Sequence, residues 1–548
     1  MLFKYSVLGC LLALPAYIEA VKQEDFKLCH QASFCRRNRG FADLVRSGVR
    51  PSAGSAMPDW AVPSPAATPE TVATGNHLSA YSLQPDSAHL TEGLFEADVT
   101  NELFGTPLRL TVECLTSGVA RVQLVEPKDK ALRPRYDGLD HFVLVSEQYR
   151  PRDKNAQLVR RSAESTGAED RATGEVLEIT YAQRPAGGQT PGSAVLARIQ
   201  SSPLAITFIQ RHYHVDSAPG PDGQSWTDEV LLAINRDGFL NYEHYRTPET
   251  DESLLKTLRN PDTAEQGRFR VAQPLADEDG RWRETFRSWT DAKPHGPASI
   301  GVDISFPGFA HVYGIPEHAT GLSLKTTRGP EAPYSEPYRL YNLDVFEYIM
   351  DSPMALYGSI PFMTAHRPGT SVGVFWLNSA ETWVDIEKYR VSSLSPSLKA
   401  RLSQLMALGH HDSKAELTAV TTSTHWMSES GHLDIFVLPG GGHPADVLTQ
   451  YGGLTGTTAL PPTFSLAYHQ CRWNYNSQAD VLDVDAHFDE HDIPYDVIWL
   501  DIEHTDDKRY FTWDPNHFAD PVAMQTALAA KKRKLVTIVD PHIKNDAS

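Results

Sequence analysis

Two apolar runs near the carboxyl end of the sequence, each followed at once by acidic residues, constrain the fold most. Residues 495–500 are mostly apolar and lead into Asp501 and Glu503, and residues 534–539 lead into Asp540. An apolar run of this length is typical of a strand buried on both faces, as in a parallel sheet. In a parallel α/β barrel, chemistry is built at the carboxyl ends of the strands. The pattern therefore predicts a parallel sheet with an acidic edge.

Helical signals lie between these runs and indicate β/α units. We expect a strand at 463–471 and helices at 479–490 and 521–532. Asp520 is expected to cap the second helix, whose first residue is a proline. Strands and helices in this alternation form a parallel sheet with right-handed crossovers. A whole (β/α)8 barrel needs roughly 250 residues. We therefore expect an incomplete parallel (β/α)8 barrel, its first three β/α units, over residues 461–548.

Short alternating strands characterise the middle of the chain. Residues 108–113 and 120–124 alternate apolar and polar side chains, as strands with one solvated face do. Similar strands, separated by Gly, Pro and Asp, recur at 204–210, 230–235, 299–305, 371–377, 419–423 and 433–438. This spacing predicts a large antiparallel β-sandwich over residues 101–460. Charged stretches at 150–173 and 247–266 are expected to be exposed insertions.

The first twenty residues have the features of a secretory signal peptide. Lys4 precedes an apolar stretch at 5–17, which is too short to span a bilayer. A buried amino-terminal helix is the alternative. Residues 21–100 are expected to form an N-terminal extension, in which the Pro-, Ala- and Ser-rich segment 51–73 cannot hold a packed core. No later stretch is long and apolar enough to cross a membrane, so we expect a lumenal or extracellular protein with no membrane span after signal removal.

The composition limits the possible ligands and suggests one covalent link. A formal net charge of −19 repels phosphate backbones, so no nucleic-acid partner is expected. In an oxidising compartment, Cys29 and Cys35 are close enough in sequence to form a disulfide. A metal site with His30 is the alternative, but two thiols and one histidine are an incomplete ligand set for zinc, and we expect no metal or cofactor. Cys114 and Cys471 lie in strand-like contexts and are expected to be buried free thiols.

Three acidic residues at the predicted sheet edge could carry chemistry. On spacing alone, Asp501, Glu503 and Asp540 could bind a metal, form an acid/base pair, or cap neighbouring helices. Three tryptophans lie near them in the sequence, Trp473, Trp499 and Trp513. Flat aromatic faces beside carboxylates fit the apolar face and the hydroxyl rim of a sugar. The residues therefore favour a carbohydrate site, with capping left open for each acid.

Longer motifs connect the chain to a known family. The motifs near the carboxyl end are Ala467-Tyr-His-Gln-Cys-Arg-Trp-Asn-Tyr475, Trp499-Leu-Asp-Ile-Glu-His504 and Ile538-Val-Asp-Pro-His-Ile543. Those upstream are Phe306-Pro-Gly, His311-Val-Tyr-Gly-Ile-Pro-Glu-His318, Tyr341-Asn-Leu-Asp-Val345 and Leu356-Tyr-Gly-Ser-Ile-Pro-Phe362. The first set resembles the first three barrel strands of glycoside hydrolase family 31, and the second resembles that family's galactose-mutarotase-like N-terminal β-sandwich. The segment from Phe26 to Cys35 is similar to the mature start of family members of the endoplasmic reticulum.

The resemblance implies a role for each candidate residue. Asp501 is expected to hydrogen-bond the hydroxyls of a glucose in the −1 subsite. The walls of that subsite are expected to be Trp473, Ile502 and Ile538. Asp344 lies on a sandwich loop that in the family reaches toward the +1 sugar. Glu503 and Asp540 are expected to be supporting residues.

The resemblance also implies a reaction and its setting. Family members carry out retaining hydrolysis with two aspartates about 5 Å apart, and the nucleophile lies in a Trp-X-Asp-Met-Asn-Glu type motif on the fourth strand. No such motif occurs in this sequence. We therefore expect no catalytic residue in this chain, with the nucleophile and the acid lying beyond Ser548, and no activity of the chain by itself.

The implied parent enzyme is an α-glucosidase that trims α-1,3-linked glucose from N-glycans of glycoproteins in the lumen of the endoplasmic reticulum. A separate β subunit is the implied partner, which would supply retention and mannose recognition. A non-catalytic, shortened product that binds glycans or a partner through its sandwich is the alternative. A different activity of the family, such as α-xylosidase, fits less well with the Cys29/Cys35 start and the signal sequence.

Overall fold

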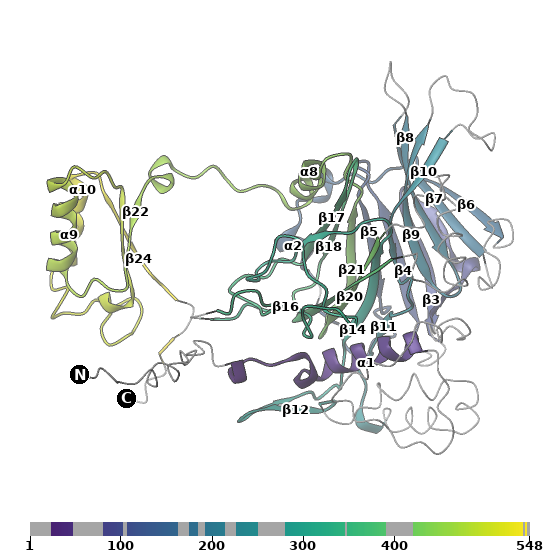
Figure 1. The fold of residues 1–548 in the computed structure, drawn as a ribbon, viewed down its shortest axis with the longest axis horizontal. Coiled ribbons are helices and arrows are strands. Elements are labelled where there is room, and N and C mark those ends of the chain that lie inside the picture. Colours follow the sequence, from purple (N-terminus) through teal and green to yellow (C-terminus); the bar gives the residue numbers. More distant parts are fainter. Residues whose placement is uncertain are drawn as a thin grey trace, which may run out of the picture. The chain divides into compact units, whose positions relative to one another are not determined.

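The described part of the chain forms two compact units. The computed structural model describes residues 23–47, 81–101, 107–136, 138–162, 175–184, 192–213, 226–249, 280–345, 348–390, 420–540 and 543–544. The units are Met1–Gly456 and Thr457–Ser548 (Figure 1). The predicted signal peptide at 1–20 and the segment at 51–73 lie outside the described residues. Within the described ranges, no helix has both the length and the apolar character that a membrane span requires.

Two large antiparallel sheets build the first unit. The nine-stranded sheet has the order β1-β3-β4-β5-β21-β18-β17-β15, with β2 paired to β3, and the ten-stranded sheet has the order β16-β19-β20-β14-β10-β9-β8-β7-β6, with β11 paired to β14. The nine strands are β1 (Tyr81–Leu83), β2 (His89–Thr91), β3 (Leu94–Asn101), β4 (Leu108–Cys114), β5 (Ala120–Val125), β15 (Val312–Gly314), β17 (Phe362–Arg367), β18 (Thr370–Trp376) and β21 (Leu433–Leu438). The ten strands are β6 (Gln157–Ser162), β7 (Glu175–Arg184), β8 (Ser193–Gln200), β9 (Ala205–Tyr213), β10 (Trp226–Ile234), β11 (Asn241–Tyr242), β14 (Ile300–Phe306), β16 (Tyr338–Leu340), β19 (Thr382–Arg390) and β20 (Val420–Ser428).

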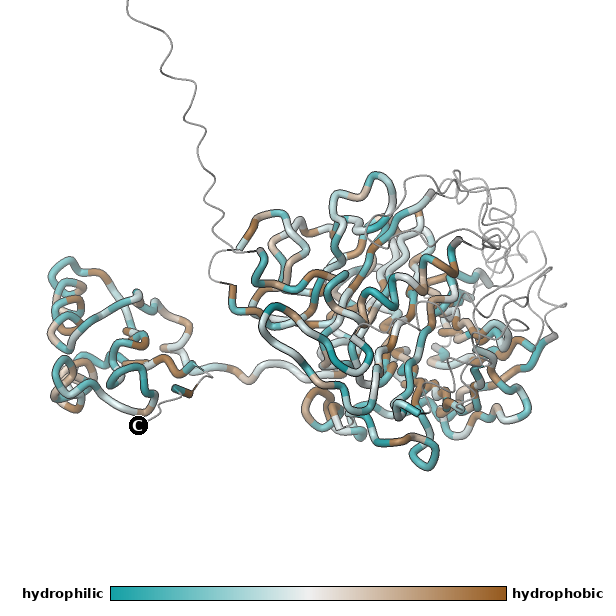
Figure 2. Tube along the Cα trace, turned by 90° about the horizontal axis from the view of Figure 1, so that it is seen from below, coloured by the Kyte–Doolittle hydropathy of each residue, from teal (hydrophilic) through white to brown (hydrophobic). Residues whose placement is uncertain are grey.

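The main hydrophobic core contains residues of both sheets. Alternation along β4 places Leu108, Leu110 and Val112 in this core, and hydrophobic and hydrophilic residues succeed one another in short segments along the chain (Figure 2). Trp376 of β18 and Trp426 of β20 stack with ring centroids 5.7 Å apart. The predicted antiparallel sandwich is therefore confirmed.

Helices cover the outer faces of the central strands, which are buried along their whole length. Helix α8 (Pro444–Thr455) packs Val447 and Leu454 against Phe375 and Phe436 of the nine-stranded sheet. Helix α1 (Ser33–Ser47) lies on the ten-stranded sheet beside β14 and β20 (Figure 1). Because both faces of each sheet are covered there, β14, β18 and β21 are buried at every position. Their side chains therefore do not alternate between buried and exposed. The shorter helices of this unit are η1 (Gln23–Asp25), η2 (Cys29–Gln31), η4 (Pro85–Ser87), α2 (Asp140–Val143) and η5 (Glu147–Tyr149).

Buried ion pairs and apolar contacts together attach α1 to the sandwich, and Phe34 of the helix lies in one hydrophobic cluster with Trp383 and Met427. Arg37 bonds Glu243 through two hydrogen bonds of 2.8 and 3.0 Å, and Arg39 bonds Asp385 through two of 2.8 Å. At the start of the helix, Cys29 and Cys35 form a disulfide and are almost completely buried. The sequence pattern did not predict this helix, because its buried positions include arginine and asparagine.

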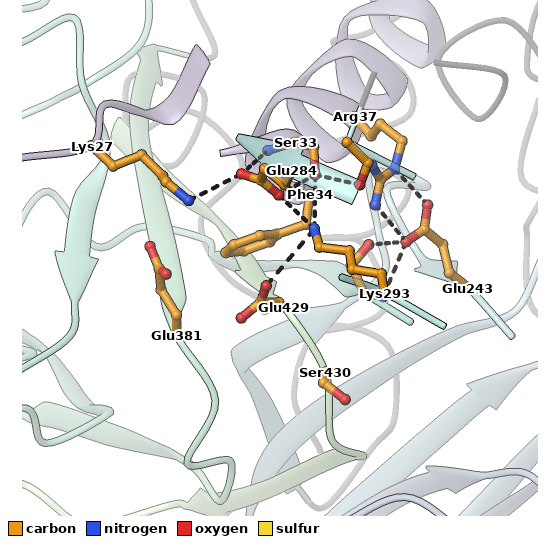
Figure 3. Close-up of polar contacts among 12 residues, drawn as sticks. Lys27, Ser33, Phe34, Arg37, Glu243, Glu284, Lys293, Glu381, Glu429 and Ser430 are labelled. Carbon is orange, nitrogen blue, oxygen red and sulfur yellow. Dashed lines mark hydrogen bonds and ion pairs between the residues drawn. The ribbon is translucent and has the colours of Figure 1, made fainter. Parts of the chain in front are cut away.

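A two-stranded hairpin, β12 (Arg283–Phe286) and β13 (Trp289–Ala292), is held to the same helix by charges. Glu284 accepts hydrogen bonds from Ser33, Lys27 and Lys293 (Figure 3). Burial acts to raise the pKa of Glu284, but the bond and charge of Lys293, with help from the other donors, lower it to about 2. The hairpin is thus tied to α1 by a carboxylate that stays charged.

The second unit has a three-stranded parallel sheet and two helices. The strands are β22 (His469–Gln470), β23 (Val497–Leu500) and β24 (Lys534–Thr537), and the helices are η8 (Thr463–Leu466), α9 (Gln478–Glu490), η9 (Ile502–His504) and α10 (Pro521–Ala530). Asp520 caps α10 by accepting a hydrogen bond from the Ala523 amide at 2.9 Å. The predicted parallel β/α units are confirmed.

Three local predictions are wrong. The strand expected at 463–471 is reduced to His469 and Gln470, because a 3-10 turn follows the paired prolines and only these two residues pair with β23. Cys471 is exposed rather than buried, whereas Cys114 is buried. The charged stretch at 150–173 contains strand β6, an edge strand whose arginines are tolerated because one side of it is unpaired. Residues 163–173 and 250–266 of the expected insertions lie outside the described ranges.

Candidate functional site

The parallel sheet of the second unit brings residues from three strands to one edge. β22 pairs with β23, and β23 pairs with β24, all in parallel register. Trp473 follows β22, Asp501 follows β23 directly, and Asp540 follows β24. Because parallel strands point the same way, these residues lie at the carboxyl edge of the sheet, where α/β folds build ligand sites.

Asp501 combines a local cap with a free acceptor. Its Oδ1 atom accepts a hydrogen bond from the Ile502 amide at 2.7 Å and so caps the short helix η9. Within the described residues, its Oδ2 atom accepts no hydrogen bond. The side chain is half-buried. One carboxylate oxygen is therefore held by the backbone while the other is available to a ligand.

Glu503 links two neighbours through one carboxylate. Its Oε1 atom accepts hydrogen bonds from Trp473 Nε1 at 3.3 Å and from Lys508 Nζ at 2.8 Å. Burial acts to raise the pKa of Glu503, but the bonds from Lys508, Asn474 and Trp473 outweigh it and lower the pKa. Glu503 is therefore a charged acceptor that orients the exposed indole of Trp473.

Asp540 is bound by a tyrosine that the sequence reasoning missed. The hydroxyl of Tyr510 donates a hydrogen bond to Asp540 Oδ2. Burial, this bond and the negative charge of Asp501 together raise the pKa of Tyr510 to about 12. The phenol therefore stays protonated and lies within electrostatic reach of both acids. Its position on a loop rich in charged residues, just after a strand end, was the available signal.

The apolar candidates differ in how much surface they offer. Trp473 is 67% exposed, and Ile502 and Ile538 are half-buried beside the acids in the chain. The other two tryptophans make contacts within the unit, and their expected role toward a sugar stays a prediction. Trp499 donates its indole N–H to His469 at 2.9 Å, and Trp513 packs against Phe518 in the core of the unit.

Asp344 belongs to the sandwich unit, where its side chain is exposed. Its neighbour is Tyr357, whose hydroxyl donates to the Val345 carbonyl at 3.0 Å. Burial and a hydrogen bond with Asp344 raise the pKa of Tyr357. Asp344 is therefore available on the surface of a loop that its neighbours stabilise.

Two further features of the described residues do not suggest catalysis. Among these residues, no group of three or more His, Cys, Asp or Glu side chains is arranged to hold a metal ion. A mostly apolar pocket of about 150 Å³ lies beside the N-terminal disulfide segment and includes Phe26, Leu343 and Trp383 in its lining. Of the charged residues of the pocket, Lys27 pairs with Glu284, Arg339 pairs with Glu381, and Glu336 accepts a hydrogen bond from the Cys29 amide at 2.8 Å.

Comparisons with known proteins match both units. Residues 109–385 match the Glycosyl hydrolase 31 N-terminal galactose mutarotase-like domain, and residues 458–548 match the Glycosyl hydrolases family 31 TIM-barrel domain. Neutral alpha-glucosidase AB of Sus scrofa is 38% identical over 553 residues, covering 99% of this chain and 48% of that protein. Glucosidase 2 subunit alpha of Schizosaccharomyces pombe is 48% identical over 318 residues, covering 58% of this chain and 30% of that protein. The chain spans about half the length, or less, of these curated relatives.

Solved structures agree with these matches. A crystal structure of an ER glucosidase II heterodimeric complex, formed by the catalytic subunit and the binding domain of the regulatory subunit, has a TM-score of 0.70 and 40% sequence identity, covering 95% of this chain and 47% of that chain. A Glc1Man2-bound glucosidase II alpha subunit has a TM-score of 0.68 and 39% identity, covering 95% of this chain and 47% of that chain. The second unit is thus similar to part of a family 31 barrel.

Proposed function

Because the chain belongs to glycoside hydrolase family 31, we propose that it carries the sugar-binding start of a retaining α-glucosidase that removes α-1,3-linked glucose from N-linked glycans. The observation that supports this most is the group formed by Trp473, Asp501, Glu503 and Asp540 at the carboxyl edge of the parallel sheet. Carboxylate oxygens beside an exposed aromatic face fit a hexose, which has hydroxyl groups at its rim and an apolar ring face.

In this proposal each residue of the site has its own role in binding the sugar. Asp501 accepts hydrogen bonds from glucose hydroxyls through its free oxygen, and such charge-assisted bonds are the strong kind. Trp473 forms one wall of the −1 subsite, with Ile502 and Ile538 as the others. Asp344 contacts the +1 sugar from its sandwich loop, and Glu503 and Asp540 support the site.

We assign the nucleophile and the acid to none of the residues of this sequence. Retaining hydrolysis uses one carboxylate as nucleophile and a second as acid and base, about 5 Å apart across the bond. The proposal gives neither role to any of these 548 residues, because Asp501 binds hydroxyls and the Trp-X-Asp-Met-Asn-Glu type motif is missing from the sequence. The chain by itself is expected to bind sugar without hydrolysing it.

The partner and the compartment are also proposals. The similar crystal structure contains a regulatory subunit's binding domain, and another similar structure holds Glc1Man2. These support a glucosidase II β subunit as partner, an N-glycan of a glycoprotein as substrate, and the lumen of the endoplasmic reticulum as location. Co-purification of a tagged chain with the β subunit from microsomes tests the partner, and recovery of the chain without it would contradict that part.

Isothermal titration calorimetry of the 548-residue chain with nigerose and with 1-deoxynojirimycin tests the function. We expect binding of both by the native chain and a loss of about tenfold or more with Asp501→Asn, because a charged acceptor of sugar hydroxyls is removed. Asp492→Asn is the matched control, since Asp492 is exposed in the same unit and belongs to no candidate site. No binding by the native chain would refute the proposal. Turnover of a chromogenic α-glucoside above background would refute the assigned lack of catalytic groups.

A further inference from the structure

Residues 505–513, a loop that lies between η9 and α10 in the sequence, contribute two side chains that contact acids at two different strand ends. Lys508 contacts Glu503, and Tyr510 contacts Asp540. We propose that Lys508 and Tyr510 are positioning residues that hold Trp473, Glu503 and Asp540 of the proposed sugar site in their binding geometry before the sugar arrives. The inference rests on the proposed function for the identity of its ligand, but the contacts themselves are described by the structure.

Lys508 acts on the Trp473 wall through Glu503. The indole is 67% exposed, so packing alone restrains it little. Its hydrogen bond goes to the same Glu503 oxygen that binds the Lys508 ammonium. Lys508 therefore neutralises and places the acceptor on which the orientation of Trp473 depends. Without Lys508, the carboxylate loses its charged partner and is held by its bonds with Asn474 and Trp473.

Tyr510 acts on the acids of both neighbouring strands. Its hydroxyl donates to Asp540, which follows β24, and it lies within the electrostatic influence of Asp501, which follows β23. The protonated phenol supplies a hydrogen-bond donor to Asp540, whose negative charge would otherwise lack this partner near the like charge of Asp501. Tyr510 thus fixes Asp540 without adding a charge to the proposed sugar site.

The loop is itself held in one conformation. Asp507, Lys508 and Phe511 have φ angles of 51°, 63° and 63°, in the left-handed region that such residues rarely adopt. Thr512 Oγ1 accepts from the Asp506 amide at 2.9 Å, and Lys544 Nζ donates to the Asp507 carbonyl at 2.9 Å. Backbone of this kind persists only where its surroundings determine it, and it clusters at functional sites. The loop is therefore a suitable frame for positioning.

Fluorine NMR of the 5-fluorotryptophan-labelled chain tests the Lys508 contact without any sugar. The Trp473 resonance is assigned with Trp473→Phe. We expect Lys508→Met and Glu503→Ala to shift this resonance and to increase its solvent isotope effect, because the indole loses its restraint. Lys532→Met, at an exposed lysine of the same unit, should leave it unchanged. An unchanged Trp473 resonance in Lys508→Met would overturn this half of the inference.

Calorimetry with 1-deoxynojirimycin tests whether the contacts serve binding. We expect Lys508→Met and Tyr510→Phe each to weaken binding by about tenfold to a hundredfold, the range for a lost hydrogen bond to a charged group. Tyr468→Phe, which also removes a tyrosine hydroxyl bonded on the surface of this unit, should change binding less than about twofold. Native binding with unaffected variants would overturn the inference and leave the proposed function intact, whereas no native binding would refute the proposed function.

A double-mutant cycle separates positioning from a general structural effect. If Tyr510 acts through Asp540, then Tyr510→Phe should weaken binding in the native background but add little in an Asp540→Asn background. The same cycle on the free energy of unfolding should show coupling between the two residues and needs no ligand. Additive losses in both measurements would show that Tyr510 does not act through Asp540.

Discussion

Some charged residues of the sandwich unit are buried together with an oppositely charged partner. The Arg37 and Glu243 side chains are each 1% exposed, and Glu243 also accepts hydrogen bonds from the amide and hydroxyl of Ser299. Burial acts to raise the pKa of Glu243, but Arg37 and these donors outweigh it and lower the pKa to about 2. The carboxylate remains charged inside the protein because its partners are buried with it.

Removing Arg37 should therefore be costly. Arg37→Met leaves a buried, uncompensated carboxylate, which typically costs about 3–5 kcal/mol at neutral pH. Urea unfolding at pH 7 measures the loss, with Arg283→Met at an exposed arginine as the control. A loss no larger than that of the control would show that the pair contributes little.

The same pair should give the unit an acid dependence. The folded pKa of Glu243, about 2, lies below the ordinary value of 4.5, so its stabilisation is present above about pH 4.5 and is lost as the pH falls toward 2. Between pH 5 and pH 3 we expect the native chain to lose more stability than Arg37→Met, in which the carboxylate has lost its main reason to stay ionised. Parallel pH profiles of the two proteins would contradict this account.

Among the elements, helix α10 is stabilised by a single capping residue. Asp520 accepts from the Ala523 amide at the start of the helix, and replacing such a cap by alanine costs about 1 kcal/mol. We expect Asp520→Ala to lower the free energy of unfolding of the second unit by this amount and Asp520→Asn to retain most of it, because asparagine also caps. Thermal unfolding of both variants measures these losses of stability. Equal losses for the alanine and asparagine variants would argue against capping.

The N-terminal helix has a covalent restraint at its beginning. Cys29 and Cys35 close a loop with a sequence separation of 6, for which the chain-entropy estimate is about 2 kcal/mol. The double variant Cys29→Ala/Cys35→Ala should lower the midpoint of thermal unfolding of the sandwich unit accordingly. Cys471→Ala, at an exposed free thiol, is the control. Equal midpoints for the double variant and the native chain would show that the link does not stabilise the fold.

Elements with regular hydrophobic patterns could be predicted from the sequence, and those with polar contacts could not. Strand β4 alternates and was expected, and α10 carried its cap and proline in the sequence. Helix α1 was missed because arginine and asparagine occupy buried positions whose partners lie hundreds of residues away. In the candidate site, the strand-end acids followed from the strand pattern. Tyr510 did not, since its contact with Asp540 depends on loop backbone angles that periodicity does not encode.

At the scale of the whole molecule, each unit has its own core. The sandwich core and the core formed by Tyr475, Val481, Met524 and their neighbours share no residue. A chain ending at Gly456 should therefore fold by itself. We expect its urea midpoint to match that of the sandwich transition in the full chain, measured by circular dichroism. A lower midpoint, or no cooperative transition, would show that the sandwich needs the second unit.

The sequence separation of the contacts of helix α1 determines the order in which they can form during translation. Arg39 and Asp385 are 346 residues apart in the sequence. At about 5–20 residues per second, the helix leaves the ribosome roughly 20–70 s before its partner strand is translated. In the nascent chain, Arg39 therefore lacks this partner throughout the interval, whereas Glu243, the partner of Arg37, is translated earlier. The Cys29–Cys35 link can form early, since both thiols are synthesised together.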